Sequence, residues 1–250
     1  MEISIAAEKL FSVGSFQITN SFLTTWLVMA CLVVFSVLAS RKLQSVPSGL
    51  QNFAEWVMES LFNLFDGVTT DRKLTKKFFP ICATIFLFVI IANWTEILPG
   101  LGSIGIYEEV HHGGEAKTIL VPFLRSPSAD LNFTLAIALI SVFSIQFFGI
   151  AIVGFFKYFK KFINFRGPIN FFVGILELIS EVSKLISFSL RLFGNIFAGE
   201  VLLMVMAFLV PFLAPIPFYL LEIFVGLVQA LIFSLLTLVF LTVAAKADEH

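Results

Sequence analysis

Five long apolar stretches alternate with polar segments along the chain. Each contains the roughly 20 mostly apolar residues with which an α-helix crosses a bilayer, and they lie at residues 21–40, 78–98, 131–156, within 169–210 and at 216–245. The first begins too far into the sequence for the apolar part of a secretory signal, and Arg41 and Lys42 follow it like a stop-transfer flank. The pattern predicts an all-α membrane protein with five membrane passages.

The segment 48–66, between the first two passages, has a different pattern. Acidic and amide side chains separate apolar residues that recur at helical spacing: Leu50, Phe53, Val57, Leu61, Leu64 and Phe65. We predict an amphipathic helix that lies flat in the membrane interface. The alternative, a helix packed on a soluble loop of the same protein, is less favoured because that loop offers little else to pack against.

Lysine and arginine indicate the orientation of the passages. Of 16 such residues, 11 lie between passages one and two, between passages three and four, or at the C-terminus; 3 lie in the other loops and 2 inside passage four. Cytoplasmic loops carry the excess of positive residues. We therefore place the N-terminal segment 1–20 and the loop 99–130 outside, the C-terminus in the cytoplasm, and the chain, 1–250, in one membrane domain.

The composition supports a lipid environment and excludes several functions. Hydrophobic residues make up 58% of the chain and charged residues 13%, about half of the 25% or so that is typical of soluble domains. The net charge of -1 gives no basis for nucleic-acid binding. The nucleotide-binding pattern G-x-x-x-x-G-K-[ST] is absent, so we do not expect the chain to bind or hydrolyse ATP by itself.

Neither the cysteines nor the histidines indicate a special site. Cys31 and Cys82 lie in apolar runs and are interpreted as small buried hydrophobic residues and not as a disulfide. His111 and His112 lie beside residues of metal-binding type, but a solvated loop is favoured: Glu108, Glu109 and Glu115. We expect neither a metal nor a cofactor.

Passage four carries a polar stripe. Steps of three or four residues, which keep side chains on one face of a helix, join six positions: Glu177, Glu181, Lys184, Ser187, Arg191 and Asn195. Glu200 lies nine residues beyond Arg191, so at about 100° per residue it points roughly 180° away. We expect this helix to present an arginine to one neighbour and a carboxylate to another.

Passage four is also too long to cross the membrane upright. No proline interrupts 169–210, and a helix of this length spans about 60 Å, twice the hydrocarbon thickness of about 30 Å. Such a helix either tilts far beyond the usual 20° or so or lies partly along the interface. We predict that 169–245 form a long, strongly tilted helical hairpin, a shape that suits packing against a curved partner.

Arg191 is the strongest functional signal. A charge inside the bilayer costs from about 3 to over 10 kcal/mol, and arginine does not lose its charge by deprotonation. Snorkelling from a helix end is disfavoured because the apolar helix continues well past Arg191, so we interpret Arg191 as a charge that lines an ion path. For Glu177, Glu181 and Lys184, a local i,i+3 or i,i+4 charge ladder is an equal alternative.

Polar residues of two other passages extend this path. Glu222 and Gln229 share a helix face because they are seven residues apart, and Gln229 lies about 10 Å deeper. With the charges of passage four on the neighbouring helix, a shared path is favoured over a glutamine that only joins helices. Asn93 and Glu96 are candidates for its mouth, with helix capping or interface anchoring as equal alternatives.

The run from Ser187 to Glu200, SFSLRLFGNIFAGE, resembles the signature of subunit a of F-type ATP synthases in its bacterial form. Gln229-Ala230, and Asn93 with Glu96, also match that family, and the resemblance covers nearly the whole chain. It implies a stator subunit in the bacterial plasma (inner) membrane that couples proton translocation to rotation of a ring and to ATP synthesis. The implied partners are a rotor ring of small hairpin c subunits, peripheral-stalk b subunits and the lipid bilayer.

The resemblance also implies roles for single residues. Arg191 would be the stator charge that faces a ring carboxylate, supported by Asn195, Lys184 and Glu181. The residues of the outer half-channel would be Glu200, Glu222, Gln229, Asn93 and Glu96, and those of the cytoplasmic half-channel Glu177 and Ser187. This sequence departs from the family at Leu185, where proline is frequent, and at Glu222, where some relatives have histidine.

The helix pairing and the function each have an alternative. A simple hairpin about 211–217 places Gln229 opposite Glu200, whereas the family implies that Gln229 pairs with Arg191, which requires a stagger between the two helices. The alternative functions are a self-contained secondary transporter with Arg191 in its substrate site, whose frequent inverted repeats are not visible, and a structural membrane scaffold.

Overall fold

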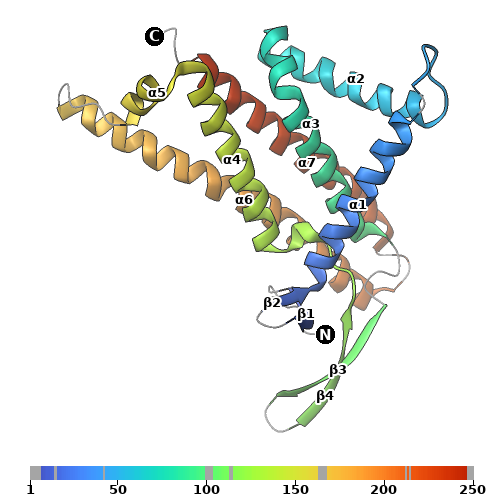
Figure 1. Cartoon of the computed structure of the whole chain (residues 1–250). Coiled ribbons are helices and arrows are strands. Elements are labelled where there is room, and N and C mark those ends of the chain that lie inside the picture. Colours follow the sequence, from blue (N-terminus) through green and yellow to red (C-terminus); the bar gives the residue numbers. More distant parts are fainter. Residues whose placement is uncertain are drawn as a thin grey trace. The chain divides into compact units, whose positions relative to one another are not determined.

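Seven α-helices make up most of the described part of the chain (Figure 1). The computed structural model describes residues 7–13, 16–41, 43–98, 104–112, 115–162, 168–211, 213 and 215–246, with backbone only for 13, 16, 107–112, 115–120, 160, 161 and 168. The helices are α1 (Asn20–Ser40), α2 (Leu50–Thr69), α3 (Arg72–Trp94), α4 (Leu131–Val153), α5 (Phe155–Phe162), α6 (Pro168–Leu209) and α7 (Pro215–Lys246). Two 3-10 turns, η1 (Thr95–Ile97) and η3 (Pro127–Ala129), extend α3 and precede α4.

Five of these helices are long and apolar enough to cross a membrane. They are Asn20–Ser40, Arg72–Ile97, Leu131–Val153, Ile169–Leu209 and Pro215–Lys246. The predicted all-α membrane fold with five passages is therefore confirmed. Helix α6 contains 42 residues and continues through Leu185; Figure 1 shows it as a long ribbon. The tilt of α6 and α7 in a bilayer stays a prediction.

The amphipathic segment forms helix α2, three residues longer at its C-terminal end than predicted. Its buried side includes Leu61 and Phe65, and the Phe65 ring packs on the ring of Phe79 from α3, with 5.9 Å between the ring centroids. Its other side leaves Phe53 and Trp56 exposed. The helix is confirmed, and its position in the membrane interface stays a prediction.

Two antiparallel strand pairs and one short helix were not predicted. β1 (Lys9–Val13) pairs with β2 (Phe16–Thr19), and β3 (Gly105–His112) pairs with β4 (Glu115–Pro122). Figure 1 shows each pair as a hairpin. Their polar–apolar alternation extends over too few residues to separate them from loops, and the eight residues of α5 are likewise too few for a clear helical period.

The described helices divide into two compact units, and α3, α4, α6 and α7 contribute to both. Unit 1 comprises residues 1–41, 87–134 and 192–230; unit 2 comprises 42–86, 135–191 and 231–250. Hydroxyl groups join elements inside each unit, as expected where lipid offers no hydrogen bonds. In unit 1 Ser21 donates to Asp130 at 2.5 Å. In unit 2 Ser234 donates to the carbonyl oxygen of Cys82 at 2.8 Å.

The two cysteines differ in burial. Cys82 is fully buried, as predicted, but Cys31 is exposed, so the prediction of a buried Cys31 is wrong. Cys31 lies on α1, where only Asn20, Ser21, Thr24 and Val28 are buried. The apolar sequence of α1 therefore reflects a surface suited to lipid and not a protein core, which sequence hydrophobicity does not distinguish.

Candidate functional site

In unit 1, four charged side chains from four different segments lie near one another, and we name them the charged cluster: Glu96, Arg125, Glu200 and Glu222. Arg125, in the loop before η3, donates from Nη2 to Glu200 Oε2 at 3.0 Å and from Nε to Glu200 Oε1 at 3.1 Å. The two side chains are only 9% and 21% exposed. Glu96, in η1, lies close enough to interact electrostatically with the other three. The cluster brings three carboxylates and one guanidinium together.

A glycine makes room for Glu222 in this cluster. Glu222, on α7, is 5% exposed, and its carboxylate lies directly against Gly199 of α6. A Cβ atom at position 199 would be 1.9 Å from Glu222 Oε1, far inside van der Waals contact. The hydrogen side chain of Gly199 thus lets a carboxylate of α7 reach the backbone of α6, one residue before Glu200.

A second glycine joins α3 to α7 in unit 1. Asn93 is 2% exposed and donates from Nδ2 to the carbonyl oxygen of Gly226 at 2.9 Å. A Cβ atom at 226 would be 3.2 Å from Asn93 Cβ. Asn93 Oδ1, Glu96 Oε1 and Ser128 Oγ are buried without a hydrogen-bond partner among the described residues, an arrangement that ordered water satisfies in proteins.

The contact between Gly199 and Glu222 also gives the register of α6 and α7. Gln229 follows Glu222 by seven residues, and Leu192 precedes Gly199 by seven, so the antiparallel helices place half-buried Gln229 level with Leu192. This register differs by about two helical turns from the simple hairpin that would place Gln229 opposite Glu200. The helices are staggered in the direction that the alternative pairing of Gln229 with Arg191 requires.

Unit 2 shows the same register independently. Phe188 of α6 and Phe233 of α7 pack with 5.0 Å between their ring centroids. Phe188 precedes Gly199 by eleven residues, and Phe233 follows Glu222 by eleven. Two separate contacts therefore define one pairing of the long helices.

One face of α6 is not covered by any described residue of the chain; we name it the open face. Its members recur every three or four residues and are all exposed: Ser183, Ile186, Ser187, Leu190, Arg191, Gly194, Asn195 and Ala198. Phe188, Leu192 and Ile196, between them, are at most 2% exposed. Six residues of the open face are small or polar, and two, Ile186 and Leu190, are large and apolar. A Cβ atom at Gly194 would meet nothing within 4 Å.

Arg191 is the single positive charge of the open face. Its Nη2 donates to Ser187 Oγ, one turn earlier, at 3.1 Å. Within the described ranges no carboxylate forms an ion pair with Arg191. The guanidinium is thus held by its own helix and remains accessible to a group from outside the chain.

A second polar group lies in unit 2, on the N-terminal half of α6. Lys184 Nζ is 2.7 Å from Glu181 Oε1 and 4.6 Å from the ring centroid of Phe240 on α7. This i,i+3 pair is part of the charge ladder considered for these residues, and their role in an ion path stays a prediction. Glu177, one turn before Glu181, is half-buried.

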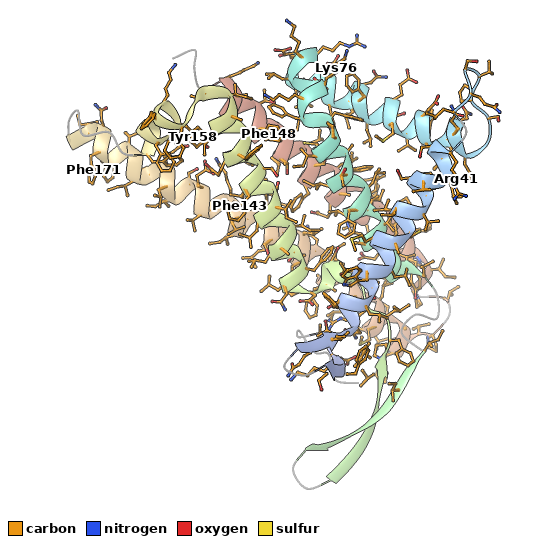
Figure 2. All side chains as sticks on the ribbon, viewed as in Figure 1. Arg41, Lys76, Phe143, Phe148, Tyr158 and Phe171 are labelled. Carbon is orange, nitrogen blue, oxygen red and sulfur yellow. The ribbon has the colours of Figure 1, made fainter. Side chains whose placement is uncertain are left out.

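Tyr158 of α5 approaches the same group of charges. Figure 2 labels Tyr158 on α5. Its ring packs on α4 where Gly149 leaves space, since a Cβ atom there would be 2.5 Å from the tyrosine Cε2. Its hydroxyl donates to Gln146 Oε1 at 2.6 Å. Burial, with the charges of Glu181 and Glu177, raises the pKa of Tyr158 to about 12. The phenol therefore keeps its proton and acts as a donor throughout the physiological pH range.

The sequence profile of a family described as ATP synthase A chain matches residues 22–242. Similar proteins include ATP synthase subunit a of Helicobacter pylori (strain Shi470), 34% identical over 96% of this chain and 98% of that protein. ATP synthase subunit a of Gloeobacter violaceus (strain ATCC 29082 / PCC 7421) is 37% identical over 92% of this chain and 86% of that protein. The chain belongs to the ATP synthase subunit a family.

Membership in the subunit a family confirms the function at a coarse level. The chain is a multi-pass membrane component of ATP synthase, a proton-translocating stator subunit that assembles with other subunits of the membrane sector. As a subunit a, it is a component of the complex and not its catalytic subunit.

Most site residues of this subunit a were visible in the sequence, but four contributors were not: Arg125, Tyr158, Gly199 and Gly226. Arg125 was counted among the basic residues of a loop. The available signal was its isolation, since it is the one basic residue between Lys117 and the passage that begins at 131. The glycines and the tyrosine gave no signal, because their importance comes from the residues packed against them.

The possible metal site considered from the sequence involves side chains outside those that the structure describes: Glu108, Glu109, His111, His112 and Glu115. Among the side chains that are described, no group of three or more histidine, cysteine, aspartate or glutamate residues is arranged for a metal ion.

Proposed function

We propose that this subunit a provides two proton half-channels and an essential Arg191 that faces the carboxylates of a rotor ring, and so couples proton flow to rotation. The observation that carries the proposal is the open face of α6. There Arg191 is exposed, has no carboxylate partner in the described part of its own chain, and is flanked by small residues. An intramembrane arginine of this kind requires a counter-charge or water, which a ring carboxylate supplies.

The composition of the open face supports a close partner. Gly194, Ala198 and Ser187 present little side-chain volume, and small residues let helices approach closely inside a membrane. A ring of small helical hairpins, each with one carboxylate, has the matching chemistry. Asn195, one turn from Arg191, adds an amide to the same face.

The charged cluster and its neighbours support an outer half-channel. Glu96, Glu200, Glu222 and Asn93 lie together in unit 1, with buried polar atoms whose hydrogen bonds are left for water. Gln229 continues the line along α7 to the level of Leu192, the residue next to Arg191 in the sequence. A hydrated line of carboxyl and amide groups can pass a proton toward the ring.

The polar group of unit 2 supports a cytoplasmic half-channel. Glu177 and Ser187 lie on α6 together with the Glu181–Lys184 pair, and Glu181 Oε2 is buried without a partner among the described residues. The positive-inside bias of the loops places this end of α6 toward the cytoplasm and the charged cluster toward the outside.

The coupling follows from electrostatics. A cation within about 4–6 Å stabilises the ionised form of a carboxylate, so a ring carboxylate beside Arg191 releases its proton. Beyond Arg191 the carboxylate enters lipid, where an ionised group is costly, so it must first take up a proton from the other half-channel. The membrane potential supplies about 2.3 kcal/mol per charge per 100 mV, and the fixed charge of Arg191 blocks direct leakage.

We expect Arg191→Ala to abolish ATP-driven proton pumping in inverted membrane vesicles, a fall of about a hundredfold or more, because several kcal/mol of charge stabilisation is lost. The amount of assembled complex should be unchanged, because Arg191 makes no contact that folds the described chain beyond its bond to Ser187.

The matched control is Arg41→Ala, which removes an exposed arginine outside the open face and should leave pumping near the wild-type rate. Near-normal pumping by Arg191→Ala would overturn the proposed function.

A further inference from the structure

The Arg125–Glu200 ion pair is a feature of the charged cluster that the proposed coupling does not use. Two parallel N–H bonds from one guanidinium fix both the position and the plane of a carboxylate. The Glu200 carboxylate accepts two such bonds, at 3.0 and 3.1 Å, from a residue 75 positions away in the sequence. Glu200 is therefore held by the loop before η3 and not by its own helix.

Arg125 is itself held in place from two sides within unit 1. Its backbone N–H donates to Thr24 Oγ1 of α1 at 3.2 Å. The next residue, Ser126, donates from Oγ to the carbonyl oxygen of Ala92 in α3 at 3.2 Å. A side chain whose backbone is anchored in this way loses little further entropy when it binds its partner, which makes it suited to position another group.

The three carboxylates of the cluster differ in their partners. Among the described residues, only Glu200 forms an ion pair; Glu96 and Glu222 form none. Glu96 nevertheless interacts with Glu200, Glu222 and Arg125, which are the charged groups around it from α6, α7 and the loop. The charge of Arg125 thus offsets one of three negative charges that share a small buried space.

We propose that Arg125 is a positioning residue of the outer half-channel. It holds the Glu200 carboxylate in an ion pair and leaves Glu96 and Glu222 as the carboxyl groups that exchange the transported proton. This inference rests on the proposed function, because it assumes that protons reach the ring through the charged cluster. It adds a residue from the loop before α4 to a path otherwise built from three membrane helices and η1.

The test is a double-mutant cycle in the assembled ATP synthase, with ATP-driven pumping in inverted vesicles as the readout. Arg125→Met keeps the length of the side chain but removes its charge. It leaves an unpaired carboxylate in a buried site, which is strongly unfavourable, so pumping should fall about tenfold or more. Adding Glu200→Gln removes that carboxylate, and the double variant should pump several-fold faster than Arg125→Met alone.

The pH dependence of pumping separates a charge effect from a merely structural one. A structural defect lowers the rate by the same factor at every pH. Loss of the Arg125 charge changes the field on Glu96 and Glu222, so the pH of half-maximal pumping should move by about one unit in Arg125→Met and return toward the wild-type value in the double variant. Arg41→Met serves as the control for loss of an exposed arginine.

Wild-type pumping by assembled Arg125→Met would overturn the inference, as would a double variant no faster than Arg125→Met. If Arg125→Met does not assemble, exchange of the pair by Arg125→Glu with Glu200→Arg decides instead. If the exchanged pair pumps faster than Arg125→Glu alone and Glu200→Arg alone, the pairing role is supported. If it pumps no faster than these two single variants, the pairing role is refuted. If the Arg125 variants give the contradicting result while Arg191→Ala abolishes pumping as expected, only the role of Arg125 is rejected. If Arg191→Ala pumps at the wild-type rate, the proposed function itself is rejected.

Discussion

At the scale of single residues, glycines matter as much as charged residues. Glu222 occupies space that exists only because position 199 has no Cβ atom. The carboxylate of Glu222 and the carboxylate of Glu200 thereby reach the same cluster from two different helices. A residue whose side chain is one hydrogen atom thus determines where a titratable group of another helix lies.

Gly199→Ala should therefore impair proton transport without unfolding the chain. The added methyl group displaces the Glu222 carboxylate, which lies at the end of a flexible side chain and can rotate away at little cost. Because misplacement of a reacting group by about 1 Å can lower a rate by as much as a hundredfold, we expect pumping to fall by about tenfold. The measurement is the initial rate of ATP-driven pumping, normalised to assembled complex.

The matched control is Gly67→Ala in α2, where an added Cβ atom meets nothing within 4 Å. Equal pumping by the two alanine variants would show that the close contact of Gly199 with Glu222 has no part in transport.

Residues of this kind also mark the limit of what the sequence predicts. Arg191, Glu200 and Glu222 stand out because a charge in an apolar run is unusual wherever it points. The Arg125–Glu200 pair does not stand out, because its two members are 75 residues apart and one lies in a loop. The importance of Tyr158 depends in the same way on contacts with Gln146 and Gly149 that only the folded chain brings together.

At the scale of elements, the open face of α6 is the feature with the clearest functional consequence. Eight exposed positions from Ser183 to Ala198 follow the helical period, and Phe188, Leu192 and Ile196 between them are buried. The chain covers one side of α6 with its own α7, as the packing of Phe188 on Phe233 illustrates. The other side is not covered by the described residues.

Gly194→Leu tests whether that partner is in close contact. Position 194 has open space in the chain itself, so the variant should fold and insert normally. Overpacking of a tight contact costs about 1–3 kcal/mol, so a ring that packs on the open face should be retained poorly and pumping should fall about tenfold or more. The measurements are co-purification of the ring with the chain and ATP-driven pumping.

Gly67→Leu, another exposed helical glycine with open space, is the control for the added leucine. Full retention of the ring together with normal pumping in Gly194→Leu would contradict a close partner at this face.

Membrane helices were the most predictable elements, for a physical reason. A passage needs about 20 apolar residues in sequence, so length and composition alone identify it, and all five predicted passages correspond to helices. The pairing of α6 with α7 was not predictable, because hydrophobicity does not encode register. A contact between one glycine and one carboxylate decided it.

At the scale of the whole molecule, the polar groups fall into two separate sets. Glu96, Arg125, Glu200 and Glu222 belong to unit 1, whereas Glu177, Glu181, Lys184 and Tyr158 belong to unit 2. Each set has one buried carboxylate oxygen without a hydrogen-bond partner among the described residues, on Glu96 and on Glu181. Two half-channels that open on opposite sides of the membrane require such a division, since one continuous polar path would leak protons.

Thiol labelling tests this division directly. In a chain carrying Cys31→Ser and Cys82→Ser, we expect Glu222→Cys to react with a membrane-impermeant cationic methanethiosulfonate only from the outer side, and Glu177→Cys only from the cytoplasmic side. A charged reagent reaches a thiol only through water. The measurement compares labelling in right-side-out and inverted vesicles.

Ser40→Cys, at the exposed cytoplasmic end predicted for α1, is the control for vesicle orientation. Labelling of Glu222→Cys and Glu177→Cys from one and the same side would contradict two opposed half-channels.

The pairing of α6 with α7 has a consequence for how this family can vary. Because contacts inside the helices fix the pairing, residues added after Leu209 and before Pro215 merely enlarge the turn between them. A single residue inserted between Phe188 and Gly199 would instead rotate one contact by about 100° relative to the other. Evolution is therefore free to lengthen or shorten the turn, while insertions and deletions within the paired segments are selected against.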